Sequence, residues 1–145
     1  MGSIDIAPDS ITSKHYTAVI FDLGDVLFSW SLPESSPQSL PAKTLGSILR
    51  SVEWMEYEKG NLTEDEVYSL IAQKYSVSPV DVKRSFEDAR NTLEINRKIL
   101  EVVRELKESG LAVYAMSNIS APDWKFVSAK CTAEEWALFD YIFTS

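Results

Sequence analysis

The residues whose types and positions could do chemistry are Asp22, Ser117 and Asn118. Asp22 follows a short apolar run, and Ser117-Asn118 follows a second one at 111–116. Such runs predict buried strands, and open α/β sheets place their ligands at the carboxyl ends of their strands. A carboxylate facing hydroxyl and N–H donors is suited to phosphoryl transfer, in which the carboxylate attacks phosphorus. The alternative is that Asp22 caps a turn and that Ser117 caps a turn or a helix.

The elements that would position these groups alternate between strands and helices. Strands are predicted at 18–21, 111–116 and 141–144, a loop at 28–39, and helices at 42–52, 53–59, from Thr63, 79–91, 94–109, 121–130 and from Thr132. The segment 53–59 either continues the helix before it or forms a second one. This order predicts an α/β fold with parallel strands.

The helical stretch between the first two strands is longer than one crossover connection needs. We therefore predict a helical cap at 35–92, placed over the carboxyl edge of the sheet, where it would exclude water. The core would consist of two segments, 15–34 and 93–145. Residues 1–14 are predicted to form a mobile tail.

Composition excludes several classes of function. The chain has 145 residues, of which 22 are acidic and 14 basic, and its net charge of −8 argues against nucleic-acid binding. It contains no apolar run of membrane-spanning length, and its first residues lack the pattern of a secretory signal. The single cysteine, Cys131, fits a reducing compartment. We therefore predict a cytoplasmic protein.

Several motifs together resemble the haloacid dehalogenase (HAD) superfamily. They are FDLGDVL (21–27), WMEYEKGNLTEDEVYSLI (54–71), ILEVVRELKESGLAVYAMSNIS (99–120) and FDYIFTS (139–145). The resemblance covers about residues 16–145 and is closest to the sugar-phosphate phosphatases and the phosphatase-like domain of epoxide hydrolases. It implies a Rossmann-like parallel sheet and Mg²⁺-dependent hydrolysis of a small phosphate ester through an aspartyl-phosphate.

The resemblance also implies roles for individual residues. Asp22 matches the nucleophile, which also binds Mg²⁺, and the backbone carbonyl of Gly24 matches a second Mg²⁺ ligand. Ser117 matches the hydroxyl that holds the phosphoryl group, and Asn118 follows it in the substrate site. Trp30 is a candidate for an apolar part of that site.

The sequence departs from the family pattern in two places. Gly24 stands where most of these phosphatases carry a second aspartate as general acid. Asp25, one position later, would point elsewhere, and whether it replaces that aspartate stays open. The family's lysine and second acidic pair would follow the strand at 141–144, whereas the sequence ends at Ser145. We therefore expect a truncated chain that lacks C-terminal strands and binds Mg²⁺ weakly. An uncovered sheet edge would then favour oligomers, and the activity of this chain stays open.

Two further functions follow from the same residues. FDLGDVLFSW (21–30) with AMSNIS (115–120) also resembles fungal HAD-like proteins of terpenoid pathways, which act on prenyl diphosphates as cyclases or phosphatases. Trp30, Trp54 and Tyr57 could line an apolar substrate pocket, or they could pack within the cap. A non-enzymatic alternative is a catalytically inert HAD remnant that serves as a binding or regulatory module.

Overall fold

A three-stranded parallel sheet organises one half of the molecule. The computed structural model describes residues 16–30 and 39–145, so the predicted tail at 1–14 lies outside the described residues. The strands are β1 (Ala18–Asp22), β4 (Ala112–Ser117) and β5 (Tyr141–Thr144), in the order β1-β4-β5. Asp22 lies opposite Met116 in the ladder between β1 and β4. The predicted α/β class and parallel strands are confirmed.

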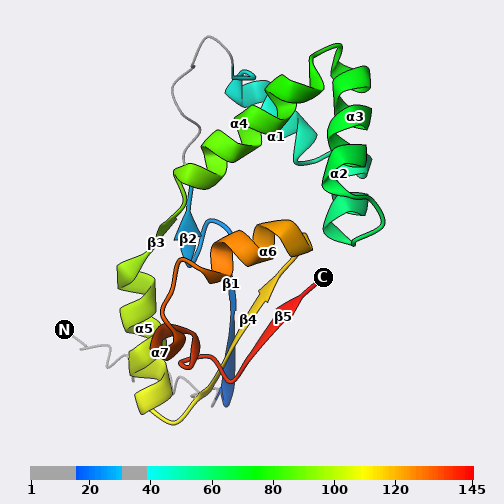
Figure 1. Cartoon of the computed structure of the whole chain (residues 1–145). Helices are drawn as coiled ribbons and strands as arrows, with labels where there is room; N and C mark the ends of the chain where they lie inside the picture. Colours follow the sequence, from blue (N-terminus) through cyan, green and yellow to red (C-terminus); the bar gives the residue numbers. More distant parts are fainter. Residues whose placement is uncertain (1–15, 31–38) are drawn as a thin grey trace, which may run out of the picture.

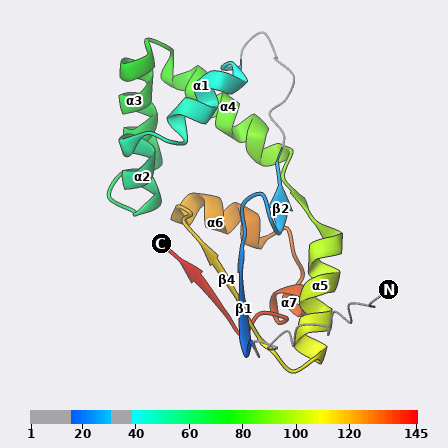
Figure 2. The ribbon, with the colours of Figure 1, turned by 180° about the vertical axis from the view of Figure 1, so that it is seen from behind.

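Seven helices surround or extend this sheet in the part of the chain that the structure describes. They are α1 (Ala42–Ile48), α2 (Val52–Glu58), α3 (Glu64–Tyr75), α4 (Pro79–Asn91), α5 (Arg97–Glu108), α6 (Ala121–Ser128) and α7 (Ala133–Trp136). We call α1–α4 the four-helix group, and β1, β4 and β5 with α5–α7 the sheet layer. Figures 1 and 2 show the four-helix group beyond the carboxyl ends of the strands. None of the helices in the described ranges is long and apolar enough to cross a membrane.

Local capping explains where several helices begin. The Thr63 and Thr132 hydroxyls each accept a bond from the backbone N–H three residues later, and the carboxylates of Glu66 and Glu135 accept one from the N–H of those threonines, which completes the two predicted capping boxes. The predicted helix at 42–52 ends early, and 53–59 belongs to a second helix. The reason is Ser51, whose hydroxyl accepts a bond from Trp54 N at 3.2 Å and so starts α2.

The structure corrects two other boundaries. The predicted helix at 94–109 begins only at Arg97, because Asn96 caps it through a bond from Ile99 N at 3.4 Å. The two residues before Asn96 form β3 (Glu94–Ile95), which pairs antiparallel with β2 (Phe28–Ser29). The predicted loop at 28–39 therefore begins with a short strand. This strand pair lies where the chain leaves the sheet layer and where it returns to it.

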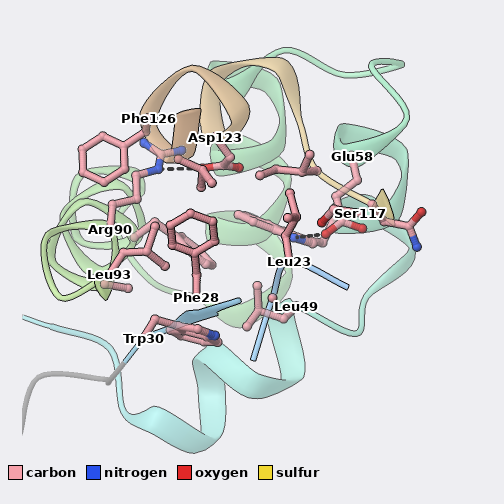
Figure 3. Close-up of a pocket in the computed structure, with 17 residues that line it drawn as sticks. Leu23, Phe28, Trp30, Leu49, Glu58, Arg90, Leu93, Ser117, Asp123 and Phe126 are labelled. Atoms are coloured by element: carbon pink, nitrogen blue, oxygen red, sulfur yellow. Dashed lines mark hydrogen bonds and ion pairs between the residues drawn. The ribbon is translucent and has the colours of Figure 1, made fainter. Parts of the chain in front are cut away.

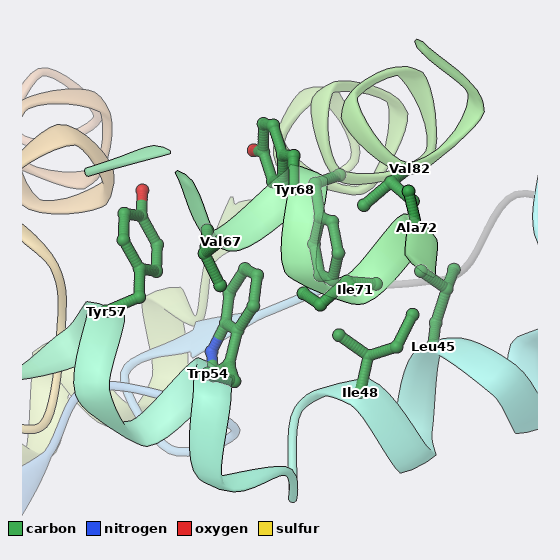
Figure 4. Close-up of a cluster of buried hydrophobic side chains, with 10 residues drawn as sticks. Leu45, Ile48, Trp54, Tyr57, Val67, Tyr68, Ile71, Ala72 and Val82 are labelled. Carbon is green, nitrogen blue, oxygen red and sulfur yellow. The ribbon is translucent and has the colours of Figure 1, made fainter. Parts of the chain in front are cut away.

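The described residues form two separate clusters of buried apolar side chains. The cluster in the four-helix group includes Trp54, Tyr57 and Phe86 and draws on each of the helices α1–α4, and Figure 4 shows its side chains converging. The alternative in which Trp54 and Tyr57 pack within the helices is therefore correct for Tyr57, which is buried there. The second cluster lies between the sheet and α5–α7 and includes Val113 and Leu100.

The sheet is covered on one face in the described structure. Alternate residues of a strand point to opposite faces, and those on the covered face, such as Val113 and Ala115, are fully buried. Large apolar side chains stand exposed on the opposite face: Ile20, Met116, Tyr141 and Phe143. Strand β1 is also an edge strand of this sheet. Its free edge and the exposed face make the sheet layer unlike the self-enclosed four-helix group.

Candidate active site

A cavity of about 220 Å³ separates the four-helix group from the carboxyl edge of the sheet. The loops after β1 and β4, helix α6, and helices α2 and α4 of the four-helix group contribute to its wall (Figure 3). Its lining residues are Leu23, Gly24, Phe28, Trp30, Leu49, Trp54, Glu58, Phe86, Ala89, Arg90, Leu93, Ser117, Asn118, Ile119, Asp123, Phe126 and Val127. Four of the five residues predicted for the site, Gly24, Trp30, Ser117 and Asn118, are therefore brought together.

Asp22 is placed differently from these four. It is solvent-exposed at the end of β1, opposite Met116, and it is not among the described residues that line the cavity. Leu23 and Gly24, which follow it directly, do line the cavity. The predicted nucleophile thus lies outside the cavity lining, at the carboxyl end of the strand that leads into the cavity wall.

A tight turn follows β1 and sets the position of Gly24. Phe28 N donates to Leu23 O at 2.8 Å, and Gly24 forms an isolated bridge with Phe28. Within this turn Asp25 has a φ of 55°, in the left-handed region that Asp tolerates better than most residues. Asp25 is exposed and does not line the cavity, as the one-residue shift from Gly24 predicted.

Aromatic and aliphatic side chains form most of the cavity wall. Trp54 stacks on Phe86 with ring centroids 4.3 Å apart, so the rings are held in place by packing within the four-helix group. Trp30 and Phe28 contribute from the segment after β1, and Figure 3 shows both on the same side of the cavity as Leu49. A pocket of this composition accepts an apolar organic group.

Arg90 spans the two halves of the molecule at one end of the cavity. Its Nε donates to Asp123 of α6 at 2.7 Å, and its terminal nitrogen donates to Glu64 of α3 at 2.6 Å. Burial alone would lower the pKa of Arg90, but the two carboxylates more than reverse that effect and raise it. The guanidinium therefore stays charged, and it ties the four-helix group to α6.

Glu58 lines the cavity and was missed by the sequence analysis. It ends α2, and its Oε1 accepts a bond from Trp54 Nε1 at 3.1 Å. Burial is the main reason that the pKa of Glu58 is raised above its usual value, and the nearby Asp123 adds to the effect. Glu58 and Ser117 lie at the same end of the cavity in Figure 3. No local signal distinguishes Glu58 from the other acidic residues of α2, because its position depends on how the two halves dock.

Solved structures with a similar fold identify the architecture. The HAD-family enzyme BT-2542 of Bacteroides thetaiotaomicron, solved with magnesium and inorganic phosphate, superimposes with a TM-score of 0.56 at 21% identity, over 90% of this chain and 69% of that one. L-2-haloacid dehalogenase of Xanthobacter autotrophicus, with chloropropionic acid covalently bound, gives 0.57 at 17% identity, over 90% and 57%. The chain has the HAD fold. This confirms the fold that the motif resemblance implied, although no protein-family model matches the chain.

Curated proteins that resemble the HAD-fold chain in sequence include two from Aspergillus species. Drimenol cyclase drtB of Aspergillus calidoustus is 47% identical over 131 residues, which make up 88% of this chain and 24% of that protein. Sesquiterpene phosphatase astK of Aspergillus oryzae is 35% identical over 130 residues, which make up 90% of this chain and 64% of that protein. The chain thus spans only part of the length of each, and the predicted likeness to fungal terpenoid-pathway proteins is confirmed.

The described residues do not form a complete magnesium site. Asp22 and the carbonyl of Gly24 were predicted as ligands, and Mg²⁺ prefers six oxygen ligands in an octahedron. Within 16–30 and 39–145, no three His, Cys, Asp or Glu side chains gather as a metal cluster. Asp22 and the Gly24 carbonyl would therefore supply two of the six ligands that Mg²⁺ prefers, and the strength of Mg²⁺ binding by this chain stays a prediction.

Proposed function

We propose that this chain is the nucleophile-bearing and substrate-binding part of a HAD-like phosphatase that acts on a phosphate ester of an apolar alcohol. One observation carries the proposal: within a HAD fold, an apolar cavity has Gly24, Ser117 and Asn118 at the carboxyl edge of the sheet. The likeness to a sesquiterpene phosphatase supports a prenyl group as the apolar part.

The polar residues at the sheet edge would handle the phosphoryl group. The Asp22 carboxylate attacks phosphorus and forms an aspartyl-phosphate, while the Ser117 hydroxyl and the Asn118 amide donate hydrogen bonds to the phosphoryl oxygens. Asp22 ends β1 two residues before Gly24 of the cavity wall, and Ser117, which lines the cavity, ends the neighbouring strand β4. Hydrolysis of the aspartyl-phosphate then regenerates the carboxylate.

The four-helix group would serve as the cap over this reaction. Its stacked Trp54 and Phe86, together with Trp30, present an apolar wall to the organic group of the ester. Burying that group would contribute about 0.8 kcal/mol per CH₂ to binding. A cap of this kind also keeps bulk water away from the phosphoryl group.

Release of phosphate from p-nitrophenyl phosphate tests the nucleophile directly. We expect Asp22→Asn to lower the rate at least about 100-fold, because an amide is a poor nucleophile. Asp25→Asn is the matched control: it makes the same chemical change three residues away, at an exposed position whose φ of 55° suits Asn, and should leave the rate unchanged. Equal rates for the wild type and Asp22→Asn would refute the phosphatase and favour the inert binding module.

A prenyl-diphosphate cyclase is the second candidate, because the relative with 47% identity is a drimenol cyclase. The two functions differ in their products from a C15 prenyl diphosphate. A phosphatase releases the acyclic alcohol or monophosphate, whereas a cyclase yields a ring-containing terpenoid. Gas chromatography with mass spectrometry of the extracted products separates them.

A further inference from the structure

Two carboxyl groups, Glu58 and Asp123, are among the described residues that line the cavity, and their surroundings differ. Asp123 accepts a bond from Arg90 at 2.7 Å and another from the Ser120 hydroxyl at 2.6 Å. Glu58 instead accepts from the neutral indole N–H of Trp54, and burial raises its pKa. Paired carboxyl groups in unlike surroundings are a common basis for dividing acid and base roles.

We propose that Glu58 is the general acid that protonates the leaving oxygen of the phosphate ester in this cavity. This inference rests on the proposed phosphatase function and adds to it the source of a proton. An alkyl alcohol leaves poorly as an alkoxide, so the reaction needs an acid beside the ester oxygen. Glu58 shares the cavity with Ser117 and Asn118, where the phosphoryl group would lie.

Other acidic residues near the sheet edge are less suited to this role. Gly24 has no side chain to offer, and Asp25 is exposed in a left-handed turn outside the cavity wall. Asp123 already accepts bonds from Arg90 and from the Ser120 hydroxyl. Within Glu58 itself, the bond from Trp54 occupies Oε1 and leaves Oε2 to carry the proton.

The proton balance of the reaction closes with Glu58 in this role. As an Asp22 oxygen bonds to phosphorus, the bond from phosphorus to the ester oxygen breaks, and the Glu58 proton passes to that oxygen. The products are the neutral alcohol, the aspartyl-phosphate and a Glu58 carboxylate. The carboxylate then takes a proton from the water that attacks the aspartyl-phosphate, which releases phosphate and restores both residues.

Two substrates with different leaving groups test the proposal in the same enzyme. A prenyl monophosphate needs a proton on its leaving oxygen, whereas p-nitrophenolate leaves without one. Glu58→Gln should lower kcat on the prenyl monophosphate by about 100-fold or more, but change kcat on p-nitrophenyl phosphate by less than about 3-fold. The amide oxygen of Gln still accepts the bond from Trp54, so an unchanged urea midpoint is expected.

Glu56→Gln is the matched control, because Glu56 lies on the same helix but binds Lys59 and Asn61 at the surface. It should leave both rates unchanged. In the wild type, the prenyl monophosphate reaction should also fall as pH rises and Glu58 ionises, with Asp123 and Arg90 as the charged groups that face it across the cavity. In Glu58→Gln, the rate of the prenyl monophosphate reaction should no longer fall as pH rises.

The outcomes distinguish failure of the Glu58 role from failure of the proposed phosphatase function. Equal losses on both substrates, or no loss on either, would overturn the role of Glu58 and leave the phosphatase standing. A wild-type chain that hydrolyses neither substrate would overturn the phosphatase and the general acid together. Carboxyl ¹³C NMR adds a readout that needs no turnover: Glu58 should titrate above 4.5 and Glu56 below it. The reverse order would contradict the environment on which the proposal depends.

Discussion

The four-helix group and the sheet layer bury their apolar residues in different ways. The four-helix group encloses its cluster, so that Ile48, Val67 and Ile71 have no exposed surface. The sheet layer buries one face against α5–α7 and leaves Ile20 and Tyr141 exposed on the other. The first arrangement resembles a finished small core. The second relies on helices on one side only, within the described structure.

Because of this difference, the two regions contribute different parts of the proposed site. The enclosed group holds Trp54 rigidly through its stacking on Phe86, which shapes the apolar wall. The sheet layer contributes strand ends, and its polar groups lie in loops after β1 and β4. Arg90 joins the two regions through Asp123. Substitutions matched between the regions can therefore test the comparison.

The largest expected effect comes from the same substitution in each region. Ile71 is 0% exposed and Ile20 is 57% exposed. Ile71→Ala should lower the free energy of unfolding by about 2–5 kcal/mol, because it leaves a cavity in an enclosed core. Ile20→Ala should cost less than about 1 kcal/mol. Urea midpoints measure both, and similar losses would show that the sheet face is covered after all.

The next effect concerns the connection between the regions. Arg90→Met should cost about 2 kcal/mol of stability, because it leaves the carboxylates of Asp123 and Glu64 partly buried without their partner. Lys83→Met on the same helix removes an exposed pair with Glu87 at 4.0 Å and should cost less than about 0.5 kcal/mol. If the two variants unfold at the same urea concentration, Arg90 does not join the regions.

A smaller effect should appear as a dependence on pH. Burial would raise the pKa of Glu64, but the bonds from Arg90 and Tyr68 outweigh it and lower the pKa below 4.5. A carboxyl whose pKa is lower in the folded state stabilises the fold above its unfolded pKa, and that contribution is lost as pH falls through the folded value. Glu64→Gln should therefore lose less stability on acidification than the wild type. Acid titrations of the wild type and Glu64→Gln, followed by circular dichroism, measure this. Equal losses of stability in the two proteins would contradict the prediction.

The smallest expected effect on stability comes from a substitution that should change self-association of the chain. We expect two chains to associate through the edge of β1 and its exposed face, because an uncovered apolar edge strand pairs readily. Ile20→Lys should abolish this association with little change in stability. Val102→Lys is the control, because Val102 is an exposed apolar residue of α5. This substitution should leave the association unchanged. A wild type that sediments as a monomer at all concentrations would refute the expectation.

Features set by local sequence were predicted well. Strands β1, β4 and β5 consist of short apolar runs, and the capping boxes at Thr63 and Thr132 depend on residues only three positions apart. The pairing of Glu94–Ile95 with Phe28–Ser29 was missed, because it joins segments that are distant in sequence and replaces one turn of an otherwise periodic helix.

The candidate site was predicted in part for the same reason. Ser117 and Asn118 follow a strand, so their place at the sheet edge follows from the α/β pattern. Glu58 and Arg90 lie on amphipathic helices, where charged residues usually face solvent. They reach the cavity because the four-helix group docks on α6, and the sequence pattern contains no signal for that docking.

The most direct test of the account compares kcat/KM for a C15 prenyl monophosphate with that for ethyl phosphate. If the cavity between the two regions holds the apolar group, the prenyl ester should react at least about 100-fold more efficiently, since each 1.4 kcal/mol of additional binding is worth a factor of ten. Trp30→Ala should shrink that ratio while leaving ethyl phosphate unaffected. Equal kcat/KM values for the two esters in the wild type would contradict the assignment of the cavity as the substrate site.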